Sequence, residues 1–187
     1  MVELENKPKK LLLHACCAPC GAFSGEFLKS QGYDVTYFFY NPNIFPKEEH
    51  DRRLEELKRY CKDNNFPLIV DDYESEYWEK LISSYELEPE RGKRCYLCYQ
   101  MRLEKTALLA KKLGFDLFTT TLSISPHKSY EYIKGISLKL QDATDVFYLD
   151  VNLKKNDGYK KSVELSRKYG FYRQDYCGCQ YSVRKKN

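Results

Sequence analysis

The chain has 187 residues, of which 42% are hydrophobic and 31% charged, and its formal net charge is +4. This composition suits one domain with an ordinary core and argues against a disordered chain. The apolar run 11–13 is too short for a signal-peptide core or a membrane span, so we expect a cytoplasmic protein without a membrane partner. In that reducing compartment the eight cysteines are better explained as metal ligands or redox groups than as structural disulfides.

Short apolar or β-branched segments alternate with longer helical ones along the chain. The predicted strands are 11–15, 35–40, 68–70, 117–121 and 146–149. The predicted helices between them are 21–30, 47–64, 75–87, 96–113 and 129–141. This alternation requires crossover connections and predicts an α/β fold: an open, mostly parallel five-stranded sheet with helices on both faces.

The organisation expected around that sheet is a single iron–sulfur domain over residues 1–187. Residues 70–95 are expected to form a helical insertion, and residues 151–187 a basic C-terminal segment that carries cysteines back over the sheet edge. Ligands of such sheets bind beyond the carboxyl ends of the strands. The first predicted strand ends next to Cys16 and Cys17, so the chemistry of the chain is expected there.

The C-terminal segment is strongly basic. Residues 151–187 contain ten Lys or Arg and three Asp or Glu, and Arg91, Lys93 and Arg94 stand just before Cys95. Such clusters suit the phosphate backbone of a nucleic acid, although a solvated helix face gives the same pattern. The seventeen tyrosines either pack in the core or stack on bases.

Seven of the eight cysteines fall into three groups. They are Cys16, Cys17 and Cys20, then Cys95 and Cys98, then Cys177 and Cys179. A Cys-x-x-Cys pair at the start of a helix supplies two thiolates to one metal centre. Structural zinc and an iron–sulfur cluster both fit four cysteines, but the adjacent Cys16 and Cys17 favour the cluster, because neighbouring thiolates strain a single tetrahedral ion. The eighth, Cys61, shares a helix face with Leu54 and Leu57 and is expected in the core.

The Cys177-Gly178-Cys179 turn differs from the other two groups. A disulfide across one residue is a small strained ring and is readily reduced. These thiols are therefore either a redox-active pair, or ligands of a second iron with Asp175 or Cys20 nearby, or inert. Cys20 either ligates that second metal or simply begins the first helix.

Several weaker candidates also follow predicted strands. They are His14, the segment 40–44, the hydroxyl-rich segment 119–125 and His127. Each is a candidate either for turn and core structure or for contact with a substrate. The chain contains neither a Gly-x-Gly-x-x-Gly motif nor a Walker loop, so the sequence gives no support for flavin, nicotinamide or P-loop chemistry.

Taken together, five motifs resemble one family nearly from end to end. They are Leu-Leu-His-Ala-Cys-Cys-Ala-Pro-Cys at 12–20, Tyr-Asn-Pro-Asn-Ile at 40–44, Arg-Cys-Tyr-Leu-Cys at 94–98, Thr-Leu-Ser-Ile-Ser-Pro-His-Lys at 121–128 and Gly-Phe-Tyr-Arg-Gln-Asp-Tyr-Cys-Gly-Cys-Gln-Tyr-Ser at 170–182. With these motifs the chain resembles the cobalamin-independent epoxyqueuosine reductases, the QueH family.

The resemblance implies a two-electron reductive deoxygenation of epoxyqueuosine to queuosine, with release of water, at the wobble position of tRNA. It implies a fold related to the adenine-nucleotide alpha-hydrolase or PP-loop group. In this chain Cys16 and Cys17 stand where that group commonly has its phosphate loop, which argues against ATP binding.

The resemblance also implies roles for individual residues. The expected ligands of a 4Fe-4S cluster are Cys16, Cys17, Cys95 and Cys98, and Cys177 with Cys179 is the expected redox-active pair. Asp175, Tyr176 and His127 are candidates for the acid that protonates the epoxide oxygen. The expected partners are tRNA bearing epoxyqueuosine and an unidentified electron donor, and a mononuclear iron beside the cluster remains open.

Two other functions compete with this one. A PP-loop-like tRNA thiolase would also use a cluster and cysteines, but it needs an ATP-pyrophosphatase loop that the sequence lacks. A zinc-stabilised RNA-binding module without catalysis accounts for the basic segment and four cysteines, but leaves the Cys-Gly-Cys turn unexplained.

Overall fold

A five-stranded sheet forms the centre of the protein, whose computed structural model describes residues 8–155 and 157–183. The strand order is β3-β2-β1-β4-β5, and all neighbouring strands run parallel. The strands are β1 (Lys10–His14), β2 (Asp34–Phe39), β3 (Leu68–Val70), β4 (Leu117–Thr120) and β5 (Phe147–Tyr148). The open parallel sheet predicted from the sequence is confirmed, with all five strands at the expected places.

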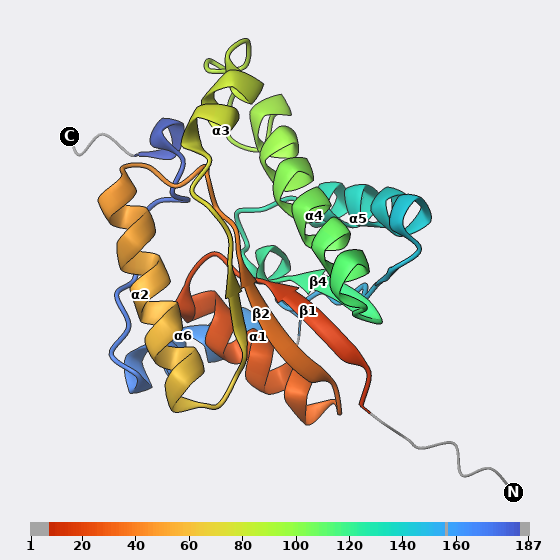
Figure 1. The fold of residues 1–187 in the computed structure, drawn as a ribbon. Helices are drawn as coiled ribbons and strands as arrows, with labels where there is room; N and C mark the ends of the chain where they lie inside the picture. Colours follow the sequence, from red (N-terminus) through yellow and green to blue (C-terminus); the bar gives the residue numbers. More distant parts are fainter. Residues whose placement is uncertain (1–7, 156, 184–187) are drawn as a thin grey trace, which may run out of the picture.

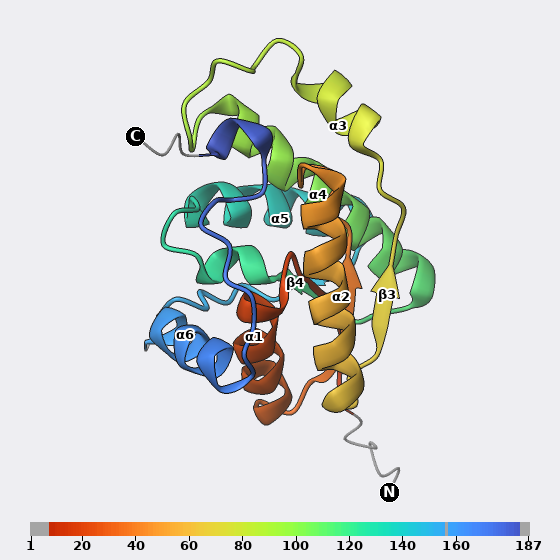
Figure 2. The same cartoon turned by 90° about the vertical axis from the view of Figure 1, so that its left-hand side faces the viewer.

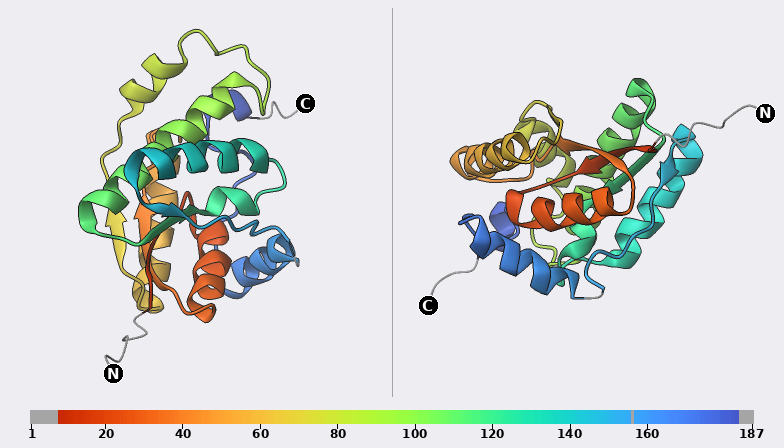
Figure 3. Two further views of the ribbon diagram at one scale, coloured as in Figure 1. Left: turned by 90° about the vertical axis from the view of Figure 1, so that its right-hand side faces the viewer. Right: turned by 90° about the horizontal axis from the view of Figure 1, so that it is seen from below.

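Helices cover both faces of this sheet (Figure 1). One face carries α1 (Ala18–Ser30) and α2 (Lys47–Asp63), with α6 (Gly158–Lys168) packed on α1 (Figure 2). The other face carries α4 (Lys93–Leu113) and α5 (Tyr130–Thr144), which lie in front in the left panel of Figure 3. Three shorter elements complete the fold: α3 (Ser75–Ile82) and the 3₁₀ turns η1 (Thr121–Ile124) and η2 (Gln180–Ser182).

The central strand β1 is buried on both faces. Leu12 packs into the core beneath α4 and α5, whereas Leu11 and Leu13 pack into the core beneath α1 and α2. A strand covered in this way has a continuous apolar run instead of an alternating one. The run Leu11–Leu13 is therefore explained by its place in the middle of the sheet.

The chain reverses its direction of travel across the sheet between β1 and β4. From β1 it moves outward through β2 to β3, and it then returns across the sheet to place β4 on the other side of β1. The loops after β1 and β4 consequently diverge at their carboxyl ends, which is where open α/β sheets bind ligands. The cysteines after β1 lie at this edge.

Helix boundaries differ from the sequence expectation by three residues or more at four places, two of which are the start of α4 at Lys93 instead of residue 96 and the end of α5 at Thr144 instead of residue 141. Helix α1 begins at Ala18 instead of residue 21, because Pro19 fits the first helical turn, where no amide donor is needed. Helix α3 ends at Ile82 instead of residue 87. The chain beyond it is held as a loop by the buried Arg94, whose guanidinium donates to the carbonyls of Tyr85, Glu86 and Glu88.

Helix α6 was not predicted from the sequence. Its buried positions are Gly158, Ser162 and Ser166, so its packed face carries no apolar period. At Gly158 an added Cβ would collide with the carbonyl of Leu153, and the helix start therefore lies close against the preceding chain. Within the described residues, no helix combines the length and apolar character needed to cross a membrane.

Candidate metal centre

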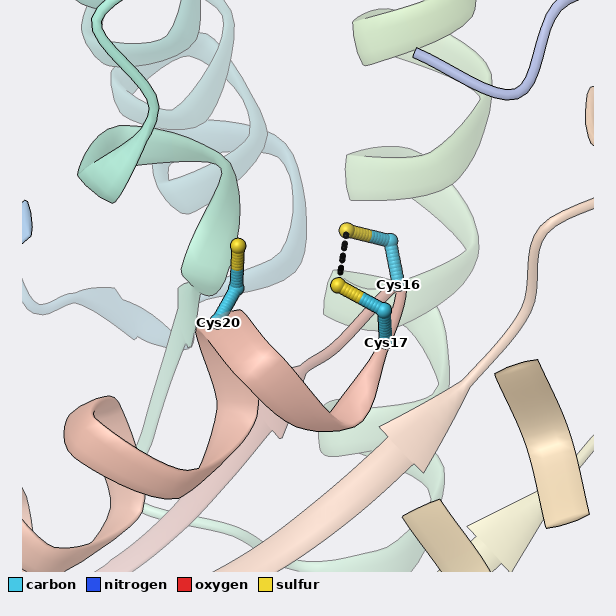
Figure 4. A group of neighbouring side chains, drawn as sticks. All are labelled: Cys16, Cys17 and Cys20. Atoms are coloured by element: carbon cyan, nitrogen blue, oxygen red, sulfur yellow. Dashed lines mark hydrogen bonds between the residues drawn. The ribbon is translucent and has the colours of Figure 1, made fainter. Parts of the chain in front are cut away.

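The three cysteines that follow β1 form a tight group of thiols. Cys16 and Cys17 lie at the junction of β1 and α1, and Cys20 lies in the first turn of α1 (Figure 4). Their sulfur atoms are all within 4.8 Å of one another, and the Sγ atoms of Cys16 and Cys17 are 3.9 Å apart. Cys16 and Cys17 are buried and Cys20 is half-buried. The first turn of α1 thus presents three sulfur ligands to one point.

A second group of thiols lies on the facing helix. Cys95 and Cys98 occupy the first two turns of α4, and with Cys177 and Cys179 they line a small cavity of about 20 Å³. The Cys-x-x-Cys pair thus opens a helix, as its sequence predicts. The sulfurs of Cys95 and Cys98 are not part of the group within 4.8 Å of one another around Cys16.

A larger cleft of about 290 Å³ adjoins this cavity. It is lined by Cys16 and Cys20 from the first group, and both hollows share Lys128 and Cys177 in their walls. The three cysteine groups, far apart in sequence, therefore meet around two connected spaces at the carboxyl edge of the sheet.

Two helix N-termini carry these thiols. Cys17 is the residue that precedes α1, and Cys95 accepts a hydrogen bond from the backbone amide of Arg91 at 3.3 Å, just before α4. Neither helix has an acidic residue in its first turn, although the Glu88 carboxylate accepts a hydrogen bond from the backbone amide of Lys93 at the start of α4 at 2.9 Å. The positive end of each helix dipole favours anionic sulfur at both places.

A buried guanidinium connects the two groups from below. Arg102 on α4 donates to the sulfur of Cys98 at 3.7 Å, to His14 Nε2 at 3.3 Å and to Asn41 Oδ1 at 2.6 Å. The His14 ring also contacts Thr120 Oγ1 through Nδ1 at 2.9 Å and the backbone carbonyl of Tyr40 through Nε2 at 3.3 Å. This network joins the ends of β1, β2 and β4 to the helix that carries Cys95 and Cys98.

The same network explains the state of His14. Burial and the charge of Arg102 lower the pKa of His14 to about 3, so the imidazole is neutral. The weak candidate His14 is therefore a fully buried, hydrogen-bonded histidine, as histidines on strands often are. Asn41 is likewise structural, since it also donates to the carbonyl of Ala15 at 2.9 Å.

A second buried guanidinium anchors the C-terminal segment at the site. Arg53 on α2 pairs with Glu49 at 2.7 Å and donates to the backbone carbonyls of Cys177 at 3.1 Å and Tyr176 at 3.4 Å. Gln174 of the same segment donates to the sulfur of Cys17 at 3.2 Å. These contacts hold the Cys177-Gly178-Cys179 turn over the thiols that follow β1.

The thiols differ in acidity. Hydrogen bonds from Cys17 and Cys20 lower the pKa of Cys16 well below its usual value. The pKa of Cys17 is raised to about 11 by its interaction with Cys16, and that of Cys20 is raised by the same partners. Of these three thiols Cys16 is therefore the one that ionises most readily. Burial raises the pKa of Cys98 to about 12 and that of Cys179 to about 11, so these thiols are protonated in the absence of a metal.

Lys128 places a positive charge between the cysteine groups. It follows η1 at the end of β4, and it lines both the cleft and the small cavity. Electrostatic interactions with the sulfurs of Cys177, Cys16 and Cys20 outweigh its burial and hold its pKa above the ordinary value, so the ammonium stays charged. Lys128 ends the motif at 121–128, and the sequence pattern alone indicates no role for it.

The remaining predicted residues divide between the cleft and the core. His127, Asp175 and Tyr176 all line the cleft, whereas the hydroxyl of Tyr176 donates to the carbonyl of Phe45 at 2.6 Å. In the hydroxyl-rich segment 119–125 only Ser125 reaches the cleft, and the others are buried beneath it. Cys61 lies in the core beneath α2, as its helical spacing predicts.

The charges around the thiols are unbalanced. Arg102, Arg53 and Lys128 all interact with the cysteines, while among the described residues only Arg53 has a carboxylate partner, Glu49. An unpaired buried cation costs several kcal/mol. The thiols, or an anionic group that they bind, are therefore the partners of these cations.

Comparison with known proteins agrees with this chemistry. A family model described as "Epoxyqueuosine reductase QueH" matches residues 11–185. The chain belongs to the epoxyqueuosine reductase QueH family. It is therefore an oxidoreductase of the class that acts in tRNA modification.

Curated members of this family align over most of their length. The chain is 41% identical to "Epoxyqueuosine reductase QueH" of Acinetobacter baylyi over 100% of this chain and 86% of that protein. It is 42% identical to the Haemophilus influenzae protein of the same name over 100% of this chain and 76% of that one. It is 36% identical to the Thermotoga maritima protein of that name, over 92% of this chain and 90% of that protein.

A solved structure shares the fold. It is described as a predicted subunit of tRNA methyltransferase from Methanocaldococcus jannaschii, and it superposes with a TM-score of 0.59 over 85% of this chain and 74% of that one. The sequence identity is 17%, so the similarity concerns the arrangement of sheet and helices alone.

Proposed function

We propose that this chain reduces epoxyqueuosine to queuosine at the wobble position of tRNA. In this reaction two C–O bonds of the epoxide break, a C=C bond forms, and the oxygen leaves as water after uptake of two electrons and two protons. The observation that carries the proposal is the convergence of three cysteine groups on two adjoining hollows at the carboxyl edge of the sheet, where Arg102, Arg53 and Lys128 interact with the thiols. Such a site suits electron transfer to a substrate that needs an electrophile at its oxygen.

We further propose that Cys16, Cys17, Cys95 and Cys98 hold a 4Fe-4S cluster. Two observations support the fit: the N-terminal ends of α1 and α4 carry the thiols, and the buried Arg102 has no carboxylate partner among the described residues. A cluster with four thiolates carries the negative charge that this environment favours. When bound, the cluster would supply electrons one at a time.

A single metal ion on Cys16, Cys17 and Cys20 is the second candidate. Zinc–sulfur bonds of about 2.3 Å place two sulfurs of a tetrahedral site about 3.8 Å apart. The sulfurs of Cys16 and Cys17 are 3.9 Å apart, so the sequence argument that neighbouring thiolates strain one ion does not hold here. This ion either replaces the cluster, as in a zinc protein, or is the mononuclear iron that accompanies it.

Metal analysis after anaerobic purification separates these cases. A brown protein with about four iron atoms supports the cluster alone, and about five supports the cluster with one further iron. A colourless protein with one zinc would reject the cluster and, with it, the reductase mechanism.

The other residues of the cleft would bind the nucleoside and move protons. Cys177 and Cys179 are a dithiol whose oxidation to a disulfide releases two electrons, and they line the cavity beside Cys95 and Cys98. The hydroxyl proton of Tyr176 is committed to a backbone carbonyl, which leaves Asp175 and His127 as proton donors among the three predicted acids. The ammonium of Lys128 is positioned to stabilise negative charge on the departing oxygen.

The decisive experiment is anaerobic incubation of the enzyme with a reductant and tRNA from cells that cannot complete queuosine. Nucleoside mass analysis is expected to show the loss of one oxygen. If the mass of epoxyqueuosine stayed unchanged while the cluster was intact and reduced, the proposed reaction would be rejected. The same tRNA incubated with ATP and a sulfur donor tests the thiolase alternative, which predicts a gain in mass. We place this tRNA-modifying reaction in the cytoplasm.

A further inference from the structure

The first turn of α6 borders the cleft. Tyr159 and Ser162 line the cleft wall, and the two residues between them, Lys160 and Lys161, are exposed to solvent. Glycine at position 158 brings this turn close against the preceding chain, so its place at the cleft is fixed by packing. Tyr159 and Ser162 thus form the cleft side of this turn, and Lys160 and Lys161 form its solvent side.

The surface around this turn is positively charged. Lys155, Lys160, Lys161, Arg167 and Arg173 are exposed, and none of them forms a salt bridge within residues 8–155 and 157–183. The exposed acids Asp157 and Glu164 stand on the same stretch, and Glu90 and Asp175 line the cleft. Cations exceed acids along 154–173 by seven to two, which favours a polyanionic partner.

Two tyrosines line the cleft, of which Tyr176 is held by contacts and Tyr159 is exposed. Tyr176 is fixed by its hydrogen bond to Phe45 and by the guanidinium of Arg53, 5.3 Å from its ring centre. Tyr159 is 39% exposed, and among the described residues its hydroxyl has no hydrogen-bond partner. A ring with an exposed face beside a basic surface suits stacking on an unpaired base.

We propose that Lys160 and Lys161 bind the phosphates of the anticodon loop while Tyr159 stacks on a loop base next to the nucleoside in the cleft. This docking surface rests on the proposed function, since it is the route by which the anticodon loop would present its modified base. The wobble base is unpaired in the loop, so entry needs no duplex opening. Lysines supply affinity that depends on salt, and the tyrosine supplies affinity that does not.

The lysine pair is tested by tRNA binding at several salt concentrations. The variant Lys160→Gln with Lys161→Gln is expected to bind tRNA on the order of tenfold more weakly, and the slope of log K against log salt is expected to become shallower by roughly one to two. The matched control is Lys111→Gln with Lys112→Gln. That pair is also exposed and lies in the last turn of α4, at the opposite edge of the sheet.

Equal losses in the two double variants would overturn the proposal, because they would show that any two charges suffice. An unchanged slope for the Lys160 and Lys161 variant would overturn it as well. Circular dichroism of both variants checks that the fold is intact.

Tyrosine stacking is tested separately. Tyr159→Phe is expected to retain tRNA affinity and Tyr159→Ala to lose it on the order of tenfold, with no change in the salt slope. Tyr77→Ala, at an exposed tyrosine on α3, serves as the control. Loss of affinity in Tyr159→Phe as large as in Tyr159→Ala would show that the hydroxyl, not the ring face, makes the contact, and would overturn the stacking role.

Failure of this surface can be told apart from failure of the proposed function. If the surface is wrong, the wild-type enzyme still binds and reduces the tRNA, and the variants do so equally well. If the function is wrong, the wild-type enzyme leaves epoxyqueuosine unchanged whatever the variants bind. When both hold, the lysine variant raises KM and leaves kcat within about twofold, because its residues act before chemistry.

Discussion

The guanidinium of Arg102 lies 3.7 Å from the sulfur of Cys98, and Cys98 precedes Arg102 by one helical turn on α4. The same side chain is 1% exposed and also contacts His14 and Asn41, so it cannot swing away to solvent. A charge held in this way keeps its effect on the sulfur whether or not a metal is bound. Arg102 is therefore a positioning residue for one proposed cluster ligand.

We expect Arg102→Met to lower the iron content or the activity by tenfold or more, since loss of a side chain that hydrogen-bonds to a metal ligand commonly has an effect of that size. Arg102→Lys keeps the charge but loses the fork that reaches three acceptors, and it is expected to recover only part of the iron. The measurements are iron per chain and the reduction potential of the cluster. Arg59→Met, at an exposed arginine on α2, is the control, and an Arg102→Met protein with a normal potential would contradict this role.

Cysteine variants should separate cluster binding from turnover. Cys95→Ala is expected to abolish the brown colour and the activity together, because it removes a proposed ligand. Cys179→Ala is expected to keep the colour and to lose turnover, because it removes one member of the proposed dithiol. Cys61→Ala, in the core beneath α2, should keep both. Normal turnover by Cys179→Ala would show that the dithiol has no role in the reaction.

Lys128→Met is expected to lower kcat/KM by about a hundredfold or more, the usual cost of removing a group that stabilises charge in a transition state. The cluster colour should remain, since Lys128 is not a proposed ligand. Lys128→Arg, which keeps the positive charge, should restore part of the activity. Lys139→Met, at an exposed lysine on α5, is the control, and an equal loss of activity in this variant would show that the effect does not come from the charge at the cleft.

His50 is expected to make the protein less stable in mild acid. It is 4% exposed, and burial lowers its pKa below 6.5 more than the neighbouring Asp51 raises it. Below pH 6.5 the unfolded chain therefore binds a proton that the folded chain does not, and the free energy of unfolding falls by up to about 1.4 kcal/mol per pH unit. Urea unfolding at pH 7 and pH 5.5 should show a smaller pH effect for His50→Gln than for the wild type.

The fold was largely predictable because the spacing of apolar residues along the chain shows which segments are strands and which are helices. The run Leu11–Leu13 indicated a strand covered on both faces, and the alternation of strand and helix indicated a parallel sheet. Helix α6 escaped prediction because it packs through glycine and serine. The backbone of α6 packs closely against the preceding chain there, in place of the burial of apolar side chains. Such packing leaves no hydrophobic pattern in the sequence.

The cysteines of the candidate site could be predicted from the sequence, whereas the buried arginines beside them could not. Cysteine spacing reveals thiols at strand and helix ends, and those thiols do gather at one edge of the sheet. Arg102 and Arg53 lie inside amphipathic helices, where an arginine looks like part of a solvated face until the fold buries it. From sequence, the segment 40–44 is a candidate either for turn and core structure or for contact with a substrate. In the structure its Asn41 accepts a hydrogen bond from Arg102 and holds that side chain in place.

Gly158 has a consequence for how this enzyme can change. Because its missing side chain sets the distance between α6 and the preceding loop, a single methyl group at that position would displace the whole helix without altering any cysteine, charge or aromatic ring. The position of α6 and the chemistry of the cysteines thus depend on different residues of the chain. In the proposed docking, the depth at which the RNA loop enters would therefore depend on this one position, while the cysteines beneath it stay the same.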